Sequence, residues 1–135
     1  MLKLIIGVKG TGKTKQLIEM VNTASAQSDG SVVCIEKGTK LTYDIKHTAR
    51  LIDTDAYGVC DGQSLFGFIA GIFASNHDVT DIYIDSALKI CNNDLASFDK
   101  LCDEVNALLI KCNVRCTMTV SLPVEDATET IKKYL

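Results

Sequence analysis

Hydrophobic positions in this chain fall into two kinds of segment, short continuous runs and longer stretches with helical spacing. Continuous apolar runs of about four to eight residues are typical of strands that are covered on both faces. Such runs predict about five strands, at residues 2–6, 31–36, 50–53, 81–85 and 114–120, of which 50–53 is the weakest.

Apolar residues three and four positions apart predict four main helices between and after these strands. They are expected at residues 13–26, 61–76, 93–113 and from Pro123 to the end. Residues 37–47 show neither pattern clearly, and we expect a loop there with a short element around residues 41–45.

Strand and helix alternate along the chain, and this order determines the expected fold. It predicts an α/β three-layer sandwich, with helices on both faces of a mainly parallel sheet of about five strands. One domain is expected over residues 1–135, because this length supplies one hydrophobic core and is too short for two. Gly67 and Gly71, one helical turn apart, are expected to let the helix at 61–76 lie close to the sheet.

The segment after the first predicted strand carries the clearest chemical motif. It has the pattern Gly-x4-Gly-Lys-Ser/Thr of a phosphate-binding loop, and it lies between a strand and a helix as that motif requires. In this pattern backbone N–H groups turn toward the phosphates, Lys13 reaches the β and γ oxygens, and Thr14 offers its hydroxyl to Mg²⁺. A helix that begins at Gly12 or Lys13 adds its positive amino end. The residues expected to bind a nucleoside triphosphate are Gly7, Val8, Lys9, Gly10, Thr11, Gly12, Lys13, Thr14 and Lys15.

Asp85 is the second candidate of the same site, because it ends the apolar run Ile82-Tyr83-Ile84. A carboxylate at the tip of a buried strand suits a Mg²⁺ ion bound beside Thr14. The predicted metal ligands are therefore Thr14 and Asp85, although an aspartate there can also be a plain helix cap.

With these motifs the chain resembles the P-loop NTPase superfamily, and more faintly its RecA-like and pilus-retraction branches. In those branches a glutamate at the end of the strand after the first helix orients the attacking water. The resemblance implies this role for Glu36, for which an ordinary strand-end carboxylate is the alternative. Ser86 stands where many P-loop ATPases carry a glutamate, and the arginine and histidine boxes of pilus ATPases are missing, so motor activity is not expected.

Other polar residues are weaker candidates. Asp53 and Asp55 suit a base or a supporting role only if their strand lies beside Asp85, and otherwise they are turn formers. Thr119 and Ser121, at the end of the last strand, suit either sensing of a γ-phosphate or the capping of the next segment. His47 and His77 are expected at the surface.

Composition excludes several classes of function. The net charge of −3 argues against sequence-independent nucleic-acid binding, which needs a basic footprint. The longest apolar stretch, residues 65–74, is about half of what a bilayer crossing needs, so we expect no membrane span and a cytoplasmic protein. Six cysteines without Cys-x2-Cys spacing favour free thiols in the core over zinc or disulfides.

The sequence therefore predicts an ATP-binding protein, a slow Mg²⁺-dependent ATPase with Lys13 and Glu36 as catalytic residues. ATP is favoured over GTP because no Asn-Lys-x-Asp segment appears. A nucleotide-dependent interaction module without significant turnover and a small-molecule kinase are the alternatives, and whether the chain is an enzyme stays open. Because the chain has two arginines, both at strand starts, we expect turnover to need a second copy or a protein partner. Arg50, Lys37 and Lys40 would then donate a charge across the interface.

Overall fold

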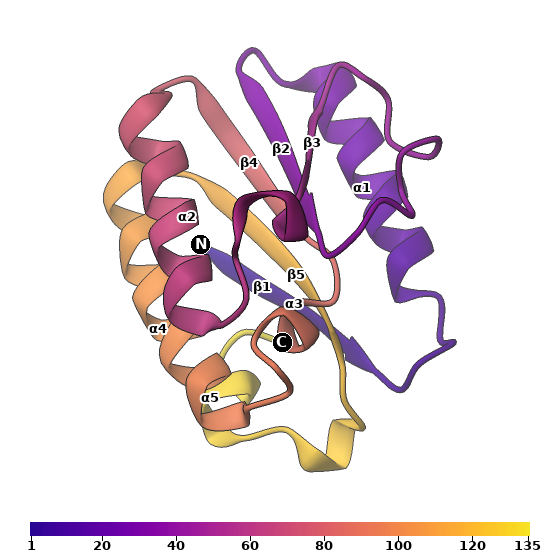
Figure 1. Cartoon of the computed structure of the whole chain (residues 1–135), viewed down its shortest axis with the longest axis vertical. Coiled ribbons are helices and arrows are strands. Elements are labelled where there is room, and N and C mark those ends of the chain that lie inside the picture. The colour runs from indigo at the N-terminus through magenta and orange to yellow at the C-terminus, as the bar shows by residue number, and fades with distance from the viewer.

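The computed structural model describes all 135 residues and contains one sheet of five strands (Figure 1). The strands are β1 (Leu2–Gly7), β2 (Ser31–Glu36), β3 (Arg50–Asp53), β4 (Val79–Ile84) and β5 (Arg115–Ser121). Their order across the sheet is β1-β5-β4-β2-β3, and every neighbouring pair is parallel. The predicted α/β fold is confirmed.

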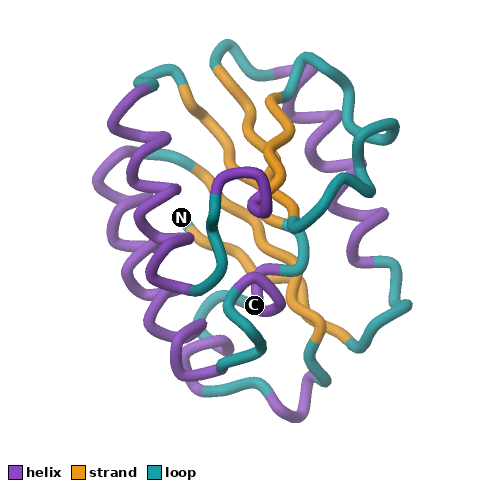
Figure 2. The backbone as a smooth tube through the Cα atoms, in the orientation of Figure 1, coloured by secondary structure: helices purple, strands orange, loops and turns teal.

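Helices lie on both faces of this sheet, as Figures 1 and 2 show. They are α1 (Lys13–Gln27), α2 (Gly62–Ser75), α3 (Ala87–Ile90), α4 (Leu95–Cys112) and α5 (Glu129–Lys132), with 3-10 turns η1 (Thr54–Tyr57) and η2 (Val124–Asp126). Helix α1 covers one face, while α2 and α4 pack against each other over the opposite face. The result is a three-layer sandwich.

Strand β2 shows why the sheet is buried on both sides. Val33 and Ile35 belong to the large apolar cluster on the side of α2 and α4. Val32 and Cys34 belong to a smaller cluster that includes Leu17 of α1. Successive side chains of a strand point to opposite faces, so a strand between two helical layers needs the continuous apolar run seen in its sequence.

The ends of the longer helices follow local capping rules. Asp61 caps α2 in a reciprocal capping box with Ser64, and the side chain of Asp94 accepts a hydrogen bond from the Ser97 amide at the start of α4. Helix α4 closes at Asn113 in the left-handed conformation, with φ 56°. The predicted boundaries of these helices are confirmed within two residues.

The segment after Pro123 is the largest departure from the predicted elements. Two short pieces, η2 and α5, replace one terminal helix, because Ala127 is extended between them. The Thr128 hydroxyl accepts the Ile131 amide at 3.1 Å and donates to Asp99 of α4 at 2.8 Å, so the helix restarts there. Helix α3 was not predicted.

The expectation for Gly67 and Gly71 is wrong. Both are exposed, and nothing lies within 4 Å of the position a Cβ would take. The close approach of α2 occurs instead at the buried Gly62, where a Cβ would lie 2.5 Å from the Oγ of Ser97 in α4. The small residue is therefore needed between two helices, and not against the sheet.

Strand β1 lies at one edge of the sheet, and the rest of the chain covers part of that edge. The Leu4 amide donates to the carbonyl of Tyr134 at 2.7 Å, and the Leu2 amide donates to Oδ1 of Asn106 at 3.0 Å. On its other side β1 pairs with β5 along its whole length, from Leu2 to Gly7.

The cysteines are free, and four of them lie in the core as expected: Cys34, Cys91, Cys102 and Cys116. Cys60 and Cys112 are exposed, so the core prediction is wrong for these two. No helix of the structure combines the length and the apolar character that crossing a membrane requires.

Candidate functional site

The loop between β1 and α1 leaves several backbone amides unused. Gly10 and Gly12 have φ values of 87° and 84°, in the left-handed region that glycine adopts without strain. No side chain caps the amino end of α1, and the amides of residues 13–15 have no acceptor in the chain. Free amides at a helix amino end favour an anion, so the loop has the geometry of a phosphate site.

Lys13 is buried at the base of this loop, with 8 % of its surface exposed. Its Nζ donates to the carbonyl of Val8 at 2.9 Å and lies 3.4 Å from Oγ1 of Thr11. Thr11 in turn donates to the same Val8 carbonyl at 2.8 Å. No carboxylate neutralises the ammonium group, which is therefore free to pair with an anionic ligand.

Asp85 follows β4 and meets Thr14 from the start of α1. The Thr14 hydroxyl lies 3.1 Å from Oδ1 and 3.3 Å from Oδ2 of Asp85. Thr119 of β5 donates to Oδ1 of Asp85 at 2.7 Å. Mg²⁺ prefers oxygen ligands and is commonly held by one or two protein groups together with phosphates and waters. The hydroxyl of Thr14 and the carboxylate of Asp85 fit that ion.

Ser86, the next residue, carries an uncommon backbone conformation. Its φ is 56° and its ψ 47°, which for a residue with a side chain costs about 1–2 kcal/mol. Its amide donates to the Thr119 hydroxyl at 2.8 Å. Thr119 thus links Ser86 and Asp85, so the turn into α3 and the carboxylate are held by one side chain.

Glu36 at the end of β2 is 3 % exposed, and both of its oxygens accept backbone amides. Oε1 accepts the amide of Lys40 at 3.1 Å, and Oε2 accepts that of Leu41 at 2.9 Å. Burial raises the pKa of Glu36, while these two hydrogen bonds oppose the shift. Glu36 lines the same cavity as Asp85, and its water-orienting role stays a prediction. What the contacts establish is that Glu36 holds the turn over residues 37–41.

Asp53 and Asp55 are not beside Asp85, because β3 pairs only with β2, at the far edge of the sheet. Asp53 accepts the amide of Gly38 at 2.8 Å, and Asp55 pairs with Lys37 at 2.7 Å. The condition for a chemical role is not met, and both aspartates brace the turn after β2.

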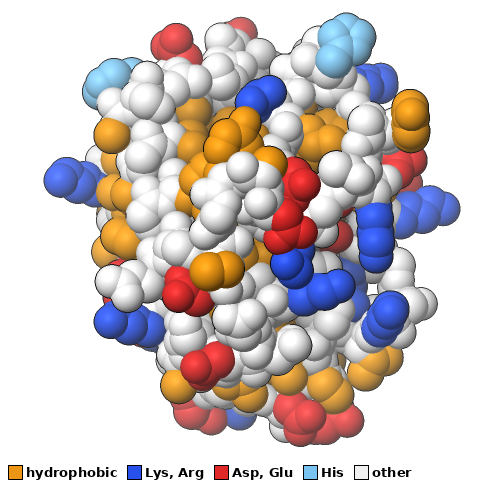
Figure 3. All heavy atoms as spheres, viewed as in Figure 1, with side chains coloured by type: hydrophobic (Ala, Val, Ile, Leu, Met, Phe, Trp, Pro, Cys, Tyr) orange, Lys and Arg blue, Asp and Glu red, His pale blue; other side chains and the backbone are white.

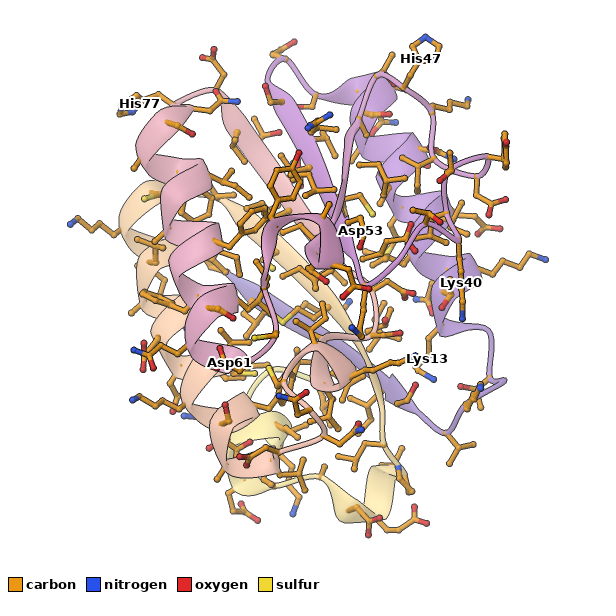
Figure 4. All side chains as sticks on the ribbon, viewed as in Figure 1. Lys13, Lys40, His47, Asp53, Asp61 and His77 are labelled. Atoms are coloured by element: carbon orange, nitrogen blue, oxygen red, sulfur yellow. The ribbon has the colours of Figure 1, made fainter.

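The two histidines are exposed, as predicted. In Figure 4, His47 and His77 lie at the top of the molecule, and Lys13 lies in its lower half. The groups of the site, such as Lys13, Glu36 and Asp85, come instead from the carboxyl ends of the strands.

A cavity of about 600 Å³ joins these groups. Lys9, Gly10, Gly12 and the residues 13–15 line it, together with Glu36, Asp85, Thr119 and Ser121. Gly7, Val8 and Thr11 were predicted to bind the nucleotide but do not line it. Gly7 lies against Thr11, because a Cβ added to Gly7 would be 2.8 Å from Oγ1 of Thr11.

Six lysines line the cavity, and three of them come from outside the loop. They are Lys9, Lys13, Lys15, Lys37, Lys40 and Lys89. Figure 3 shows Lys and Arg side chains gathered at the centre and right of this face, beside a small acidic group. Lysines from outside the loop therefore bring positive charge of the same chain to the cavity, while the need for a second copy or a partner stays a prediction. The signal was present in the sequence, since Lys37 and Lys89 follow shortly after the ends of β2 and β4.

Arg115 lies at the opposite end of the sheet, as predicted. Its guanidinium forms two hydrogen bonds with the buried Asp81, at 2.9 Å and 3.2 Å. Arg50 begins β3 and is exposed. Neither arginine lines the cavity that contains Lys13 and Asp85.

Neither a protein-family model nor a curated protein matches this chain.

Proposed function

We propose that this chain binds a nucleoside triphosphate together with Mg²⁺, with ATP preferred to GTP, and hydrolyses it slowly. The contact between Thr14 and Asp85 carries the proposal. These residues are 71 positions apart in the sequence, and their oxygens lie 3.1 Å from each other at the mouth of a loop with unused amides. If Asp85 only capped a helix, it would not need the hydroxyl of Thr14 beside it, and no side chain caps α3.

In this proposal the chain mainly positions and neutralises charge. The amides of residues 13–15 and the ammonium of Lys13 face the β- and γ-phosphates. Mg²⁺, held by Thr14 and Asp85, would neutralise the charge that develops between those phosphates. Such positioning and charge neutralisation supply most of the catalysis in phosphoryl transfer.

We propose slow hydrolysis because the site has no free carboxylate to activate the attacking water. Ser86 offers no carboxylate next to Asp85, and Glu36 has both oxygens engaged with amides. The interaction module without turnover therefore remains the second candidate. The small-molecule kinase is a third, and the additional lysines of the cavity favour it more than the sequence did.

The same lysines change the proposal for assembly. A second copy or a protein partner was expected because a cation had to reach the γ-phosphate from outside. Lys9, Lys15 and Lys37 of the same chain line the cavity, so turnover by a monomer is now the simpler proposal. We also propose a cytoplasmic location, which the free thiols support.

Ligand-induced stabilisation tests nucleotide binding. ATP with Mg²⁺ at about a hundred times its dissociation constant should stabilise the fold by about 2.7 kcal/mol. Lys13→Ala should lose most of this gain, because it removes the buried ammonium group at the loop. The melting temperature with and without ATP, GTP and Mg²⁺ is the measurement.

Two further variants complete this test. Lys46→Ala removes an exposed lysine that does not line the cavity, and it should behave as the wild type does. Asp85→Asn should remove mainly the part of the stabilisation that depends on Mg²⁺. The proposal fails if neither ATP nor GTP shifts the melting temperature of the wild type. Phosphate release measured beside binding then separates an ATPase from a binding module.

A further inference from the structure

We infer that the cavity contains a second anion site, formed by Lys40 and Lys89, that binds a phosphate-bearing small molecule next to the nucleoside triphosphate. This inference rests on the proposed function, because it assigns the part of the same cavity that the triphosphate loop does not use.

The lysines of the cavity come from two sets of elements. Lys9, Lys13 and Lys15 belong to the loop and to the first turn of α1, whereas Lys40 lies in the turn after β2 and Lys89 in α3. In Figure 4 the side chain of Lys40 is directed toward Lys13. Positive charge therefore comes to the cavity from separate elements of the fold.

Hydrogen bonds fix the backbone at both of these lysines. Glu36 fixes the turn of Lys40 through the amides of Lys40 and Leu41, at 3.1 Å and 2.9 Å. The amide of Lys89 donates to the carbonyl of Ser86 at 3.1 Å, in the turn that Thr119 holds. The two ammonium groups are thus carried by anchored turns, and not by free loops.

Neither Lys40 nor Lys89 has a carboxylate partner. The structure contains five ion pairs, and among the six lysines of the cavity only Lys37 takes part in one, with Asp55 at 2.7 Å. The acidic groups of the cavity are otherwise occupied, since Asp85 accepts from Thr14 and Thr119 and Glu36 accepts from amides. The positive charge of these lysines is therefore available to a ligand.

The charge exceeds what one nucleotide needs. Six lysines against Glu36 and Asp85 give the cavity a formal charge of +4, which falls to +3 when Asp55 neutralises Lys37. A triphosphate with its Mg²⁺ carries about −2. Half of the twelve lysines of a chain with net charge −3 line this one cavity. A second anion offsets the excess.

The lining also indicates which anion. Among the 17 lining residues two are hydrophobic, and none is an arginine or an aromatic residue. Lysine binds phosphate as a point charge. A phosphate monoester, with about −1.5 to −2 charges at neutral pH, on a small polar molecule fits best.

Calorimetric titration of the nucleotide-loaded protein tests this site. The chain is first saturated with Mg²⁺ and a non-hydrolysable ATP analogue, which blocks the loop, and inorganic phosphate is then titrated. We expect saturable phosphate binding to the loaded wild type. The double variant Lys40→Ala/Lys89→Ala should bind phosphate at least about tenfold more weakly, while its affinity for the analogue changes by less than about threefold.

The control is Lys46→Ala, which removes an exposed lysine outside the cavity and should leave both affinities unchanged. Absence of phosphate binding to the loaded wild type overturns the inference. Loss of analogue affinity in the double variant also overturns it, because the two lysines would then belong to the triphosphate site. Failure of the analogue to bind the wild type is a different result, since it removes the proposed function itself.

Discussion

The carboxylate of Glu36 accepts two backbone amides. A substitution of Glu36 therefore affects the stability of the fold as well as any rate of hydrolysis. A glutamine offers one carbonyl oxygen where the carboxylate offers two acceptors, so either the amide of Lys40 or that of Leu41 loses its partner. An amide left unsatisfied in a buried position costs about 1–3 kcal/mol. A slower ATPase in such a variant would therefore combine two causes, a displaced turn and a missing base.

We predict that Glu36→Gln lowers the free energy of unfolding by about 1–3 kcal/mol in the absence of nucleotide. Urea denaturation measures this, and Glu19→Gln, on the exposed side of α1, should change it by less than about 0.5 kcal/mol. If Glu36→Gln is as stable as the wild type, the two hydrogen bonds contribute little. A loss of hydrolysis in that case would belong to the chemical step.

At the scale of elements, glycines of the same helix have opposite roles. Gly62 begins α2 where this helix touches α4, and an added Cβ would also lie 3.3 Å from the carbonyl oxygen of Ser97. Gly67 lies in the middle of α2 and faces open space. One position restricts side-chain size, while the other only makes the helix less stable than alanine would.

We predict that Gly62→Ala destabilises the fold by about 1–3 kcal/mol through overpacking. Gly67→Ala should stabilise it by up to about 1 kcal/mol, because alanine has the higher helix propensity and restricts the unfolded chain. Chemical denaturation of both variants beside the wild type is the measurement. Equal effects of the two substitutions would contradict the contact between α2 and α4.

At the scale of the whole molecule, buried thiols lie on both faces of the sheet, so their reactivity shows whether each helical layer stays closed. Cys34 packs on the side of α1, and Cys91, Cys102 and Cys116 pack on the other side. Burial raises the pKa of Cys34, Cys91 and Cys116 to about 12, and that of Cys102 is raised as well. These thiols therefore stay protonated near neutral pH, and the thiolate is the reactive form.

We predict that a thiol reagent at pH 8 modifies two cysteines of the native chain, Cys60 and Cys112, and all six in denaturant. The reaction is followed by mass spectrometry. Replacing both exposed cysteines with serine should remove the fast reaction without unfolding the chain. Rapid modification of Cys34 would show that the layer formed by α1 opens readily.

The sequence predicted those features of the molecule that depend on local pattern. The strand at 31–36, the helices at 61–76 and 93–113 and the loop at Lys13 each follow from a short stretch of residues. The position of Asp53 and the presence of Lys40 and Lys89 at one cavity could not be predicted in the same way, because they depend on the order of the strands. Gly67 was misjudged because the sequence does not show which face of a helix meets a neighbour.

The pairing of β1 with β5 has a consequence for the order in which the molecule folds. In the sheet, β1 pairs only with β5, at residues 116–121, more than a hundred positions along the chain. Contacts this distant in sequence form late, because a long loop must be closed first. The strand that carries the phosphate-binding loop therefore gains its neighbour only when β5 has been synthesised. A chain interrupted before β5 would contain the complete motif of residues 7–14 but not the strand pairing that supports it.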